Sequence, residues 1–264
     1  MKGFLIFMAA LAVPALAQAE IVAGQISYSD NGVALEGYVA QPGEIEGKRP
    51  GVLVVHDWMG LNDHYRNIAN RLAEMGYVVF AADIYGSGIR PKNSQEAAAE
   101  ASKYKSNRSL MRERARVGLD ELKKQNNVDE NRLAAIGYCF GGTVALELAR
   151  SGVPLAGVSS FHGGLETPNP EDGKNIKAKI LALHGADDPF VPPAQVAAFQ
   201  DEMRKGKVDW QMIYYGNAVH SFTTPYAGSD PSKGVAYNEK ADRRSWQAMK
   251  NFFDEIFQTQ AAGR

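Results

Sequence analysis

The chain has 264 residues, a formal net charge of −1 and a sequence pI near 6.5, so its charge gives no reason to expect nucleic acid or an anionic membrane as a partner. It contains a single cysteine, which excludes a framework of intramolecular disulfides. The length suits one large domain with its own core, and a small molecule is the expected partner.

The N-terminus has the pattern of a secretory signal peptide. Lys2 precedes an almost wholly apolar run from Phe4 to Leu16, and the small-residue segment Ala17-Gln18-Ala19 follows. The run is shorter than the roughly 20 residues that a membrane-spanning helix needs. We therefore predict a signal peptide over residues 1–19, with Ala17 as the alternative cleavage site and an uncleaved anchor as the competing interpretation. Residues 20–264 would then form a single domain, exported to the bacterial periplasm and without a membrane span.

The elements of the mature chain begin with a hairpin and continue as alternating strands and helices. Residues 21–28 and 33–40 are expected as strands joined by the turn Asp30-Asn31-Gly32. Apolar segments predict further strands, and amphipathic or charged segments predict helices. The expected strands are 51–55, 77–82, 133–136, 155–161, 179–184 and 208–215; the expected helical segments are 62–75, 94–125, 142–149, 193–205 and 235–257. This alternation predicts an α/β fold with a mostly parallel, doubly wound sheet and an N-terminal antiparallel hairpin, and ligands bind such sheets at the carboxyl ends of the strands.

The segment Gly137-Tyr138-Cys139-Phe140-Gly141-Gly142 places the only cysteine between an expected strand and an expected helix. In a nucleophile elbow the central residue occupies a strained turn, and small flanking residues let the strand and the helix approach. Serine is the usual nucleophile there, and a thiol needs a neighbouring base because it attacks as the thiolate. Cys139 is the candidate nucleophile, with a small buried hydrophobic side chain as the alternative reading.

An acid and a base follow in later loops, each after an expected strand. Asp187 and Asp188 lie in His184-Gly185-Ala186-Asp187-Asp188-Pro189-Phe190-Val191-Pro192, and the spacing from Asp188 to the Val-Pro step favours Asp188. Its alternative role is that of a turn residue or a helix cap. His220 follows the last expected strand, so the chain order is nucleophile, acid, base, as in α/β-hydrolases. Four other histidines compete: His162 and His184 are possible site-lining residues, and His56 and His64 flank the first loop.

A tetrahedral intermediate needs two backbone donors, one from the residue after the nucleophile and one from the loop after the first parallel strand. These positions are Phe140 and Trp58. The chain has no C-x-x-C, H-E-x-x-H, phosphate-binding loop or dinucleotide-binding fingerprint. No cofactor and no metal are therefore expected.

With these motifs the sequence resembles the dienelactone hydrolase family, of the carboxymethylenebutenolidase type within the α/β-hydrolases, over most of the mature chain. The resemblance rests on Gly137 to Gly142, on Asp188-Pro189-Phe190-Val191-Pro192, on His220-Ser221-Phe222 and on Ala82-Asp83-Ile84-Tyr85. It implies a Cys139-His220-Asp188 triad and hydrolysis of a lactone or carboxylic ester through a thioester acyl-enzyme. The roles expected from the residue types agree: Cys139 attacks, His220 carries the proton and Asp188 orients the imidazole.

The chain departs from the family pattern at two positions that bear on the substrate. Asp57 stands where members acting on the muconate-type dienelactone carry a glutamate thought to contact the thiol, and its alternative role is to stabilise a turn. Thr224 stands where the family has an arginine that holds the substrate carboxylate. Lys103, Lys105 and Arg108 are possible replacements for a second family arginine, although a charged helix is often only a solvated face. A plain ester or lactone is therefore favoured over a carboxylated one.

Two other functions are compatible with the sequence. The chain could be a non-catalytic α/β-hydrolase scaffold that binds a small ligand or another exported protein, because fold alone does not establish activity. It could also be an acyltransferase, since hydrolysis and acyl transfer use the same acyl-enzyme. The physiological substrate and the oligomeric state are not determined by the sequence.

Overall fold

The computed structural model describes residues 20–258 and contains one eight-stranded sheet. The predicted signal peptide, 1–19, lies outside the described residues. The strands are β1 (Ile21–Asp30), β2 (Val33–Pro42), β3 (Arg49–Val55), β4 (Val78–Ala82), β5 (Val128–Tyr138), β6 (Gly157–Phe161), β7 (Lys179–Gly185) and β8 (Trp210–Tyr215). Their order across the sheet is β1-β2-β4-β3-β5-β6-β7-β8.

Strands β3 to β8 pair in parallel, and the β1-β2 hairpin adds to one edge in antiparallel pairing with β4. The predicted fold class is thereby confirmed. The helices between the strands are α1 (Asp63–Glu74), α2 (Ser94–Lys105), α3 (Arg108–Lys123), α4 (Phe140–Arg150), α5 (Pro193–Gly206) and α6 (Glu239–Gln258), with short 3-10 turns η1 (Pro170–Asn175), η2 (Pro225–Ala227) and η3 (Pro231–Lys233).

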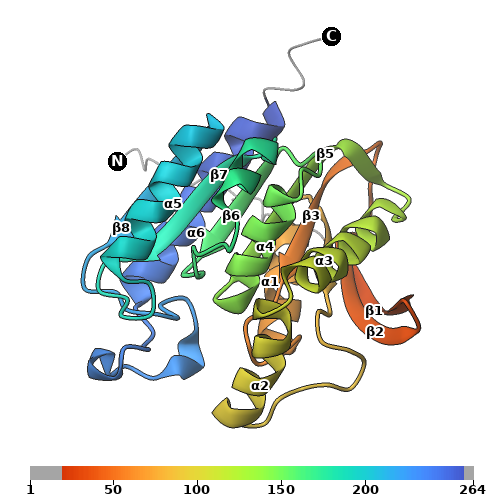
Figure 1. Ribbon diagram of the computed structural model, residues 1–264. Coiled ribbons are helices and arrows are strands. Elements are labelled where there is room, and N and C mark those ends of the chain that lie inside the picture. The colour runs from red at the N-terminus through yellow and green to blue at the C-terminus, as the bar shows by residue number, and fades with distance from the viewer. Residues whose placement is uncertain (1–19, 259–264) are drawn as a thin grey trace, which may run out of the picture.

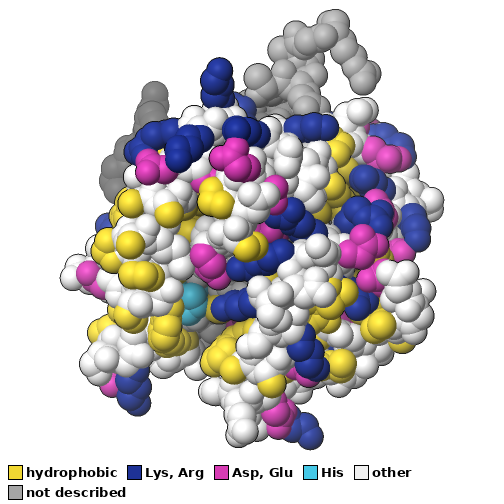
Figure 2. Space-filling view, in the orientation of Figure 1, with side chains coloured by type: hydrophobic (Ala, Val, Ile, Leu, Met, Phe, Trp, Pro, Cys, Tyr) yellow, Lys and Arg dark blue, Asp and Glu magenta, His cyan; other side chains and the backbone are white. Residues whose placement is uncertain are grey.

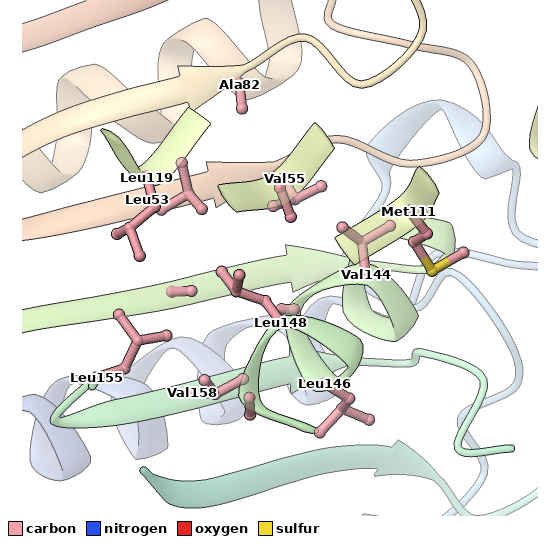
Figure 3. Close-up of a cluster of buried hydrophobic side chains, with 14 of the residues drawn as sticks. Leu53, Val55, Ala82, Met111, Leu119, Val144, Leu146, Leu148, Leu155 and Val158 are labelled. Carbon is pink, nitrogen blue, oxygen red and sulfur yellow. The ribbon is translucent and has the colours of Figure 1, made fainter. Parts of the chain in front are cut away.

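The helices cover both faces of the sheet, as Figure 1 shows. Alternate strand residues point to opposite faces, so Leu53 and Val55 of β3 belong to the apolar layer that α3, α4 and α5 complete, whereas Val52 and Val54 belong to the layer that α1 and α6 complete. Figure 3 shows Leu53 and Val55 facing side chains of α3 and α4, among them Leu119 and Val144. These two apolar layers hold the central strands rigidly, and their carboxyl ends carry the candidate site.

The predicted helical segment 94–125 is two helices. Asn93 caps α2 by accepting a hydrogen bond from the N–H of Glu96, and Asn107 caps α3 by accepting one from Leu110. A side chain that satisfies a free N–H at a helix start stabilises a new beginning. The second asparagine therefore starts a separate helix where the charge pattern alone suggested continuity.

The last helix begins at Glu239 and not at residue 235, which corrects the prediction for this segment. Val235 forms a parallel bridge with His220, and the N–H of Ala236 donates to the carbonyl oxygen of His220. The Asn238 side chain then accepts a hydrogen bond from the N–H of Ala241 and caps the helix. Residues 235–238 are extended because their backbone groups hold the His220 loop.

None of the helices described between residues 20 and 258 is both long and apolar enough to cross a membrane.

Candidate active site

The turn between β5 and α4 has the geometry of a nucleophile elbow. Cys139 has φ 53° and ψ −115°, a conformation that a residue with a side chain rarely adopts. A Cβ atom on Gly137 would lie 1.9 Å from the carbonyl oxygen of Gly141, and a Cβ atom on Gly141 would lie 2.3 Å from that of Val55. Only glycine fits at either position, and the close approach projects Cys139 from the end of the sheet.

The three residues predicted from chain order lie together in one hydrogen-bonded chain. Nε2 of His220 lies 2.9 Å from Sγ of Cys139, and Nδ1 of His220 lies 2.8 Å from Oδ2 of Asp188. The other carboxylate oxygen of Asp188 accepts a hydrogen bond of 2.9 Å from the N–H of Phe190. Asp187, the alternative acid, is exposed.

The charges of its two partners act on the imidazole of His220. Burial favours the neutral ring, but the Cys139 thiolate and the bonds to Asp188 and Cys139 favour the cation. Together they raise the pKa of His220 to about 10. The two contacts and the raised pKa therefore favour the protonated imidazole of His220 between Cys139 and Asp188.

The two residues expected to supply backbone donors lie at the cavity of the thiol. Trp58 follows β3, Phe140 is the first residue of α4, and both residues line the cavity that contains Cys139. Within residues 20–258, no protein group accepts a hydrogen bond from the backbone N–H of either residue. Both N–H groups are thus available to the oxygen of a bound carbonyl group.

The cavity around Cys139 has a volume of about 250 Å³. Figure 2 shows a histidine side chain inside a hollow on this face, with hydrophobic side chains beside it and charged side chains along its rim. The apolar part of the lining is formed by Trp58, Phe140, Phe190, Val191 and Val235, and the polar part by Lys105, Thr143, Glu166, Gln195 and Ser221. The cavity therefore suits a substrate with an apolar body and one polar group.

Four residues predicted as possible lining residues, Asp57, His162, His184 and Thr224, are buried near the site but are not among those that line this cavity. His184 lies on the far side of Asp188, where it packs against Tyr214 and borders a second cavity. Asp57 makes no hydrogen bond with the thiol; its carboxylate accepts hydrogen bonds from the N–H of Met59 and the hydroxyl of Tyr226. Thr224 donates its N–H to the carbonyl oxygen of Ser221 within the His220 loop.

Several lining residues escaped the sequence reasoning. Glu166 belongs to a loop and Gln195 to α5, and neither segment contains a recognisable motif. Oε1 of Gln195 accepts a hydrogen bond from the N–H of Leu165, and this bond holds the two segments together at the cavity. Of the three cations considered, Lys105 lines the cavity, Lys103 pairs with Glu100, and Arg108 pairs with Glu166. No pattern in the sequence separates these three, since which one faces the cavity depends on how α2 packs.

Across residues 20–258, no three histidine, cysteine, aspartate or glutamate side chains converge as a metal site would require.

Residues 35–257 match the sequence model of the Dienelactone hydrolase family. A Yersinia pestis protein named "Putative carboxymethylenebutenolidase" is 26% identical over 246 residues, which cover 88% of each chain. Two solved structures are more similar. One, titled m3DLH, is 43% identical with a TM-score of 0.86, and the other, a dienelactone hydrolase-like promiscuous phosphotriesterase from metagenomic libraries, is 42% identical with a TM-score of 0.85. Each comparison covers 89% of this chain and 98% of the other. The chain belongs to the dienelactone hydrolase family and is thus a hydrolase of ester or lactone bonds.

Proposed function

We propose that this protein hydrolyses carboxylic esters or lactones through a thioester acyl-enzyme, with Cys139 as nucleophile, His220 as acid and base, and Asp188 as the group that orients the imidazole. The observation that supports this most directly is the unbroken chain of contacts from Sγ through His220 to Asp188, at 2.9 and 2.8 Å. Both distances are those of hydrogen bonds.

In the first half-reaction, the Cys139 thiolate attacks the substrate carbonyl carbon. The carbonyl π electrons move to oxygen, and the oxyanion accepts hydrogen bonds from the N–H groups of Trp58 and Phe140. When the intermediate collapses, the carbon-oxygen bond of the leaving group breaks. The alkoxide takes the proton from Nε2 of His220, which leaves a thioester on Cys139.

In the second half-reaction, His220 is the base. Neutral Nε2 takes a proton from water as the water oxygen attacks the thioester carbon, and the same two N–H groups hold the oxyanion. Collapse expels the Cys139 thiolate and releases the carboxylic acid, and the imidazolium and thiolate are restored. For a lactone, the alcohol and the acid are two ends of one product.

The experiment compares the protein with Cys139→Ala on a panel of activated esters and lactones. We expect turnover to be lost while the circular dichroism spectrum stays unchanged, and mass spectrometry of the unmutated protein should show an acyl adduct on Cys139. Full activity of the alanine variant would overturn the proposal. No adduct with any panel member would favour the binding scaffold. Adding an alcohol that competes with water for the acyl group separates acyl transfer from hydrolysis, since transfer yields a new ester and hydrolysis yields the acid.

The cavity adds detail about the substrate. Its lining is mainly apolar, and Lys105 is the cation among its lining residues, since Lys103 and Arg108 pair with Glu100 and Glu166. We propose that neutral esters bind through the apolar wall and that Lys105 accommodates a negative or strongly hydrogen-bond-accepting group when the substrate has one. The panel should include a phosphotriester, because a relative 42% identical is titled a promiscuous phosphotriesterase. The phosphoryl oxygen of a phosphotriester, like a carbonyl oxygen, can accept hydrogen bonds from the two proposed backbone donors.

We also propose export to the periplasm with cleavage after Ala19. This rests on the charged start, apolar run and small-residue end of residues 1–19. N-terminal sequencing of the protein recovered from an osmotic-shock fraction should begin at Glu20. A first residue of Gln18 would indicate the alternative cleavage site, and an intact Met1 in the membrane fraction would contradict export by cleavage.

A further inference from the structure

His162 occupies an unusual position next to the candidate site. It is the residue after β6, its φ is 40°, and it is 1% exposed. A β-region backbone would be easier for a histidine, so the surrounding structure must hold it there. The adjacent Phe161 accepts the N–H of Cys139 at its carbonyl oxygen, and the N–H of His162 donates to the carbonyl oxygen of Leu183. The strained residue is therefore fixed between the elbow and β7.

The ring of His162 contacts the ring of His220. The two ring centroids are 5.4 Å apart with planes at 67°, and Phe190 makes a similar contact with His220 at 5.4 Å and 75°. His162 is buried, whereas Phe190 is 57% exposed. Thus His220 has one fixed aromatic neighbour on the protein side and one at the surface.

His162 is tied to the loop that carries His220. Its Nε2 lies 2.7 Å from the hydroxyl of Thr223, three residues after His220, and its ring also packs against Phe222. Its Nδ1 is buried, and no other residue of the described chain bonds to it. The Thr223 bond is consequently the contact that sets the ring's rotation.

His162 is neutral beside a charged neighbour. Burial, and then the positive charge of His220, lower the pKa of His162 well below its ordinary value. The titratable groups around the two rings are Cys139 of the elbow, Asp188 and His184 at the end of β7, Asp57 after β3 and His64 of α1. A second positive charge here would repel the His220 imidazolium, so a neutral polar ring suits the position.

We propose that His162 is a positioning residue, which through its bond to Thr223 holds the His220 ring where Nε2 meets Cys139 and Nδ1 meets Asp188 at once. Small displacements of a proton carrier cost large factors in rate. This inference rests on the proposed function for its effect on turnover, but its effect on the thiolate can be measured without any substrate.

The test uses Thr223→Val, which removes the hydroxyl, with Thr223→Ser as the matched control that keeps it, and His162→Phe, which keeps a ring of similar shape. Three quantities are measured: kcat and KM on an activated ester, and the rate at which iodoacetamide alkylates Cys139 between pH 5 and pH 9. Since Cys139 is the only cysteine, alkylation reports on this thiolate alone. We expect Thr223→Val and His162→Phe to lower kcat about tenfold to a hundredfold with little change in KM. Alkylation near pH 6 should slow in parallel, while Thr223→Ser stays within about twofold.

A merely structural role would lower the melting temperature but leave kcat per folded molecule and the alkylation profile unchanged, and that result would overturn the inference. If His162→Phe does not fold, the valine and serine pair decides. If the unmutated protein turns over no ester, the proposed function fails; the alkylation profiles then still show whether His162 positions His220.

Discussion

The carboxylate of Asp57 accepts a hydrogen bond of 2.8 Å from the backbone N–H of Met59. The backbone carbonyl oxygen of Asp57 accepts a second one, of 3.2 Å, from the N–H of Gly60. These bonds close a tight turn around Trp58, whose N–H is a proposed oxyanion donor. Burial raises the pKa of Asp57, and the hydrogen bonds that its carboxyl group accepts lower it. Asp57 thus orders the donor loop and does not hold the thiol.

We predict that Asp57→Asn keeps most of the activity, because the amide oxygen can still accept the Met59 N–H. Asp57→Ala should lose about a hundredfold in kcat, the usual effect of losing one oxyanion donor. The measurement is kcat on an activated ester for both variants. Equal damage from asparagine and alanine would show that the carboxylate charge, and not the turn, is what matters.

A second prediction concerns the proton on His220. The raised pKa of about 10 exceeds the value of about 6.5 in an unfolded chain, so the folded state binds this proton more tightly. The stability gained is complete below about pH 6.5 and is lost as the pH rises towards 10. In Cys139→Ala the largest cause of the rise is gone, and the pKa of His220 should fall.

Titration of the histidine resonances by NMR checks this directly. His56 is a useful internal control, because burial lowers its pKa and neither Cys139 nor His220 is among the groups that shift it. An unchanged pKa of His220 in Cys139→Ala would mean that no imidazolium-thiolate pair exists in the resting protein.

Gly137 provides a test of the elbow. Gly137→Ala would place a Cβ atom 1.9 Å from the carbonyl oxygen of Gly141. The atoms in conflict belong to the backbone of β5 and α4, so neither can move away without disturbing its strand or helix. We expect a loss of about 3 kcal/mol or more in the free energy of unfolding. Gly216→Ala is the matched control, since nothing lies within 4 Å of its added Cβ. Urea unfolding of the two variants makes the comparison, and equal stability would refute the packing argument.

Arg150 is fully buried and joins α4 to α5 and to Leu165, which precedes Glu166 of the cavity lining. Its guanidinium makes two hydrogen bonds with Glu202, one with Glu147 and one with the carbonyl oxygen of Leu165. Arg150→Met would leave two buried carboxylates short of a partner and should cost about 3 to 5 kcal/mol. Arg204→Met removes only exposed interactions, an ion pair with Asp201, a hydrogen bond to Gln200 and a contact with the Trp210 ring, and should change the unfolding free energy by less than about 1 kcal/mol. Thermal denaturation of the two variants makes the comparison, and the melting temperature should fall clearly for Arg150→Met and little for Arg204→Met.

Lys105 should affect specificity and not the chemical step. Lys105→Met is expected to lower kcat/KM about tenfold for esters that carry a carboxylate, because one charge-assisted bond is lost. Neutral esters should be affected much less. Lys103→Met is the control, since Lys103 is exposed and paired with Glu100. The same loss on charged and neutral esters would rule out this role for Lys105.

Much of the candidate site follows from local sequence, and the reason is steric. The elbow needs glycine at Gly137 because a Cβ atom there would meet the carbonyl oxygen of Gly141, only four residues further on, so a short segment identifies the turn and its candidate nucleophile. Alternating apolar strands and amphipathic helices determine a parallel sheet. Asp188 and His220 then follow strand ends, which meet at one edge of such a sheet. These features depend on contacts close in sequence or on a topology that few patterns permit.

The tertiary structure alone decided which side chains meet across that edge. His162 and His220 are 58 residues apart in the sequence. The contact between their rings depends on how the end of β6 packs against the loop that carries His220. The same holds for Lys105 facing the cavity, for His184 facing away from it, and for Val235, whose backbone pairs with His220 where a helix was expected. Side-chain direction at a loop or helix end is set by neighbours distant in sequence, and no local pattern encodes it. The sequence of this protein therefore determined its fold class and identified Cys139 as the candidate nucleophile, whereas packing decided which side chains surround His220 and line the cavity.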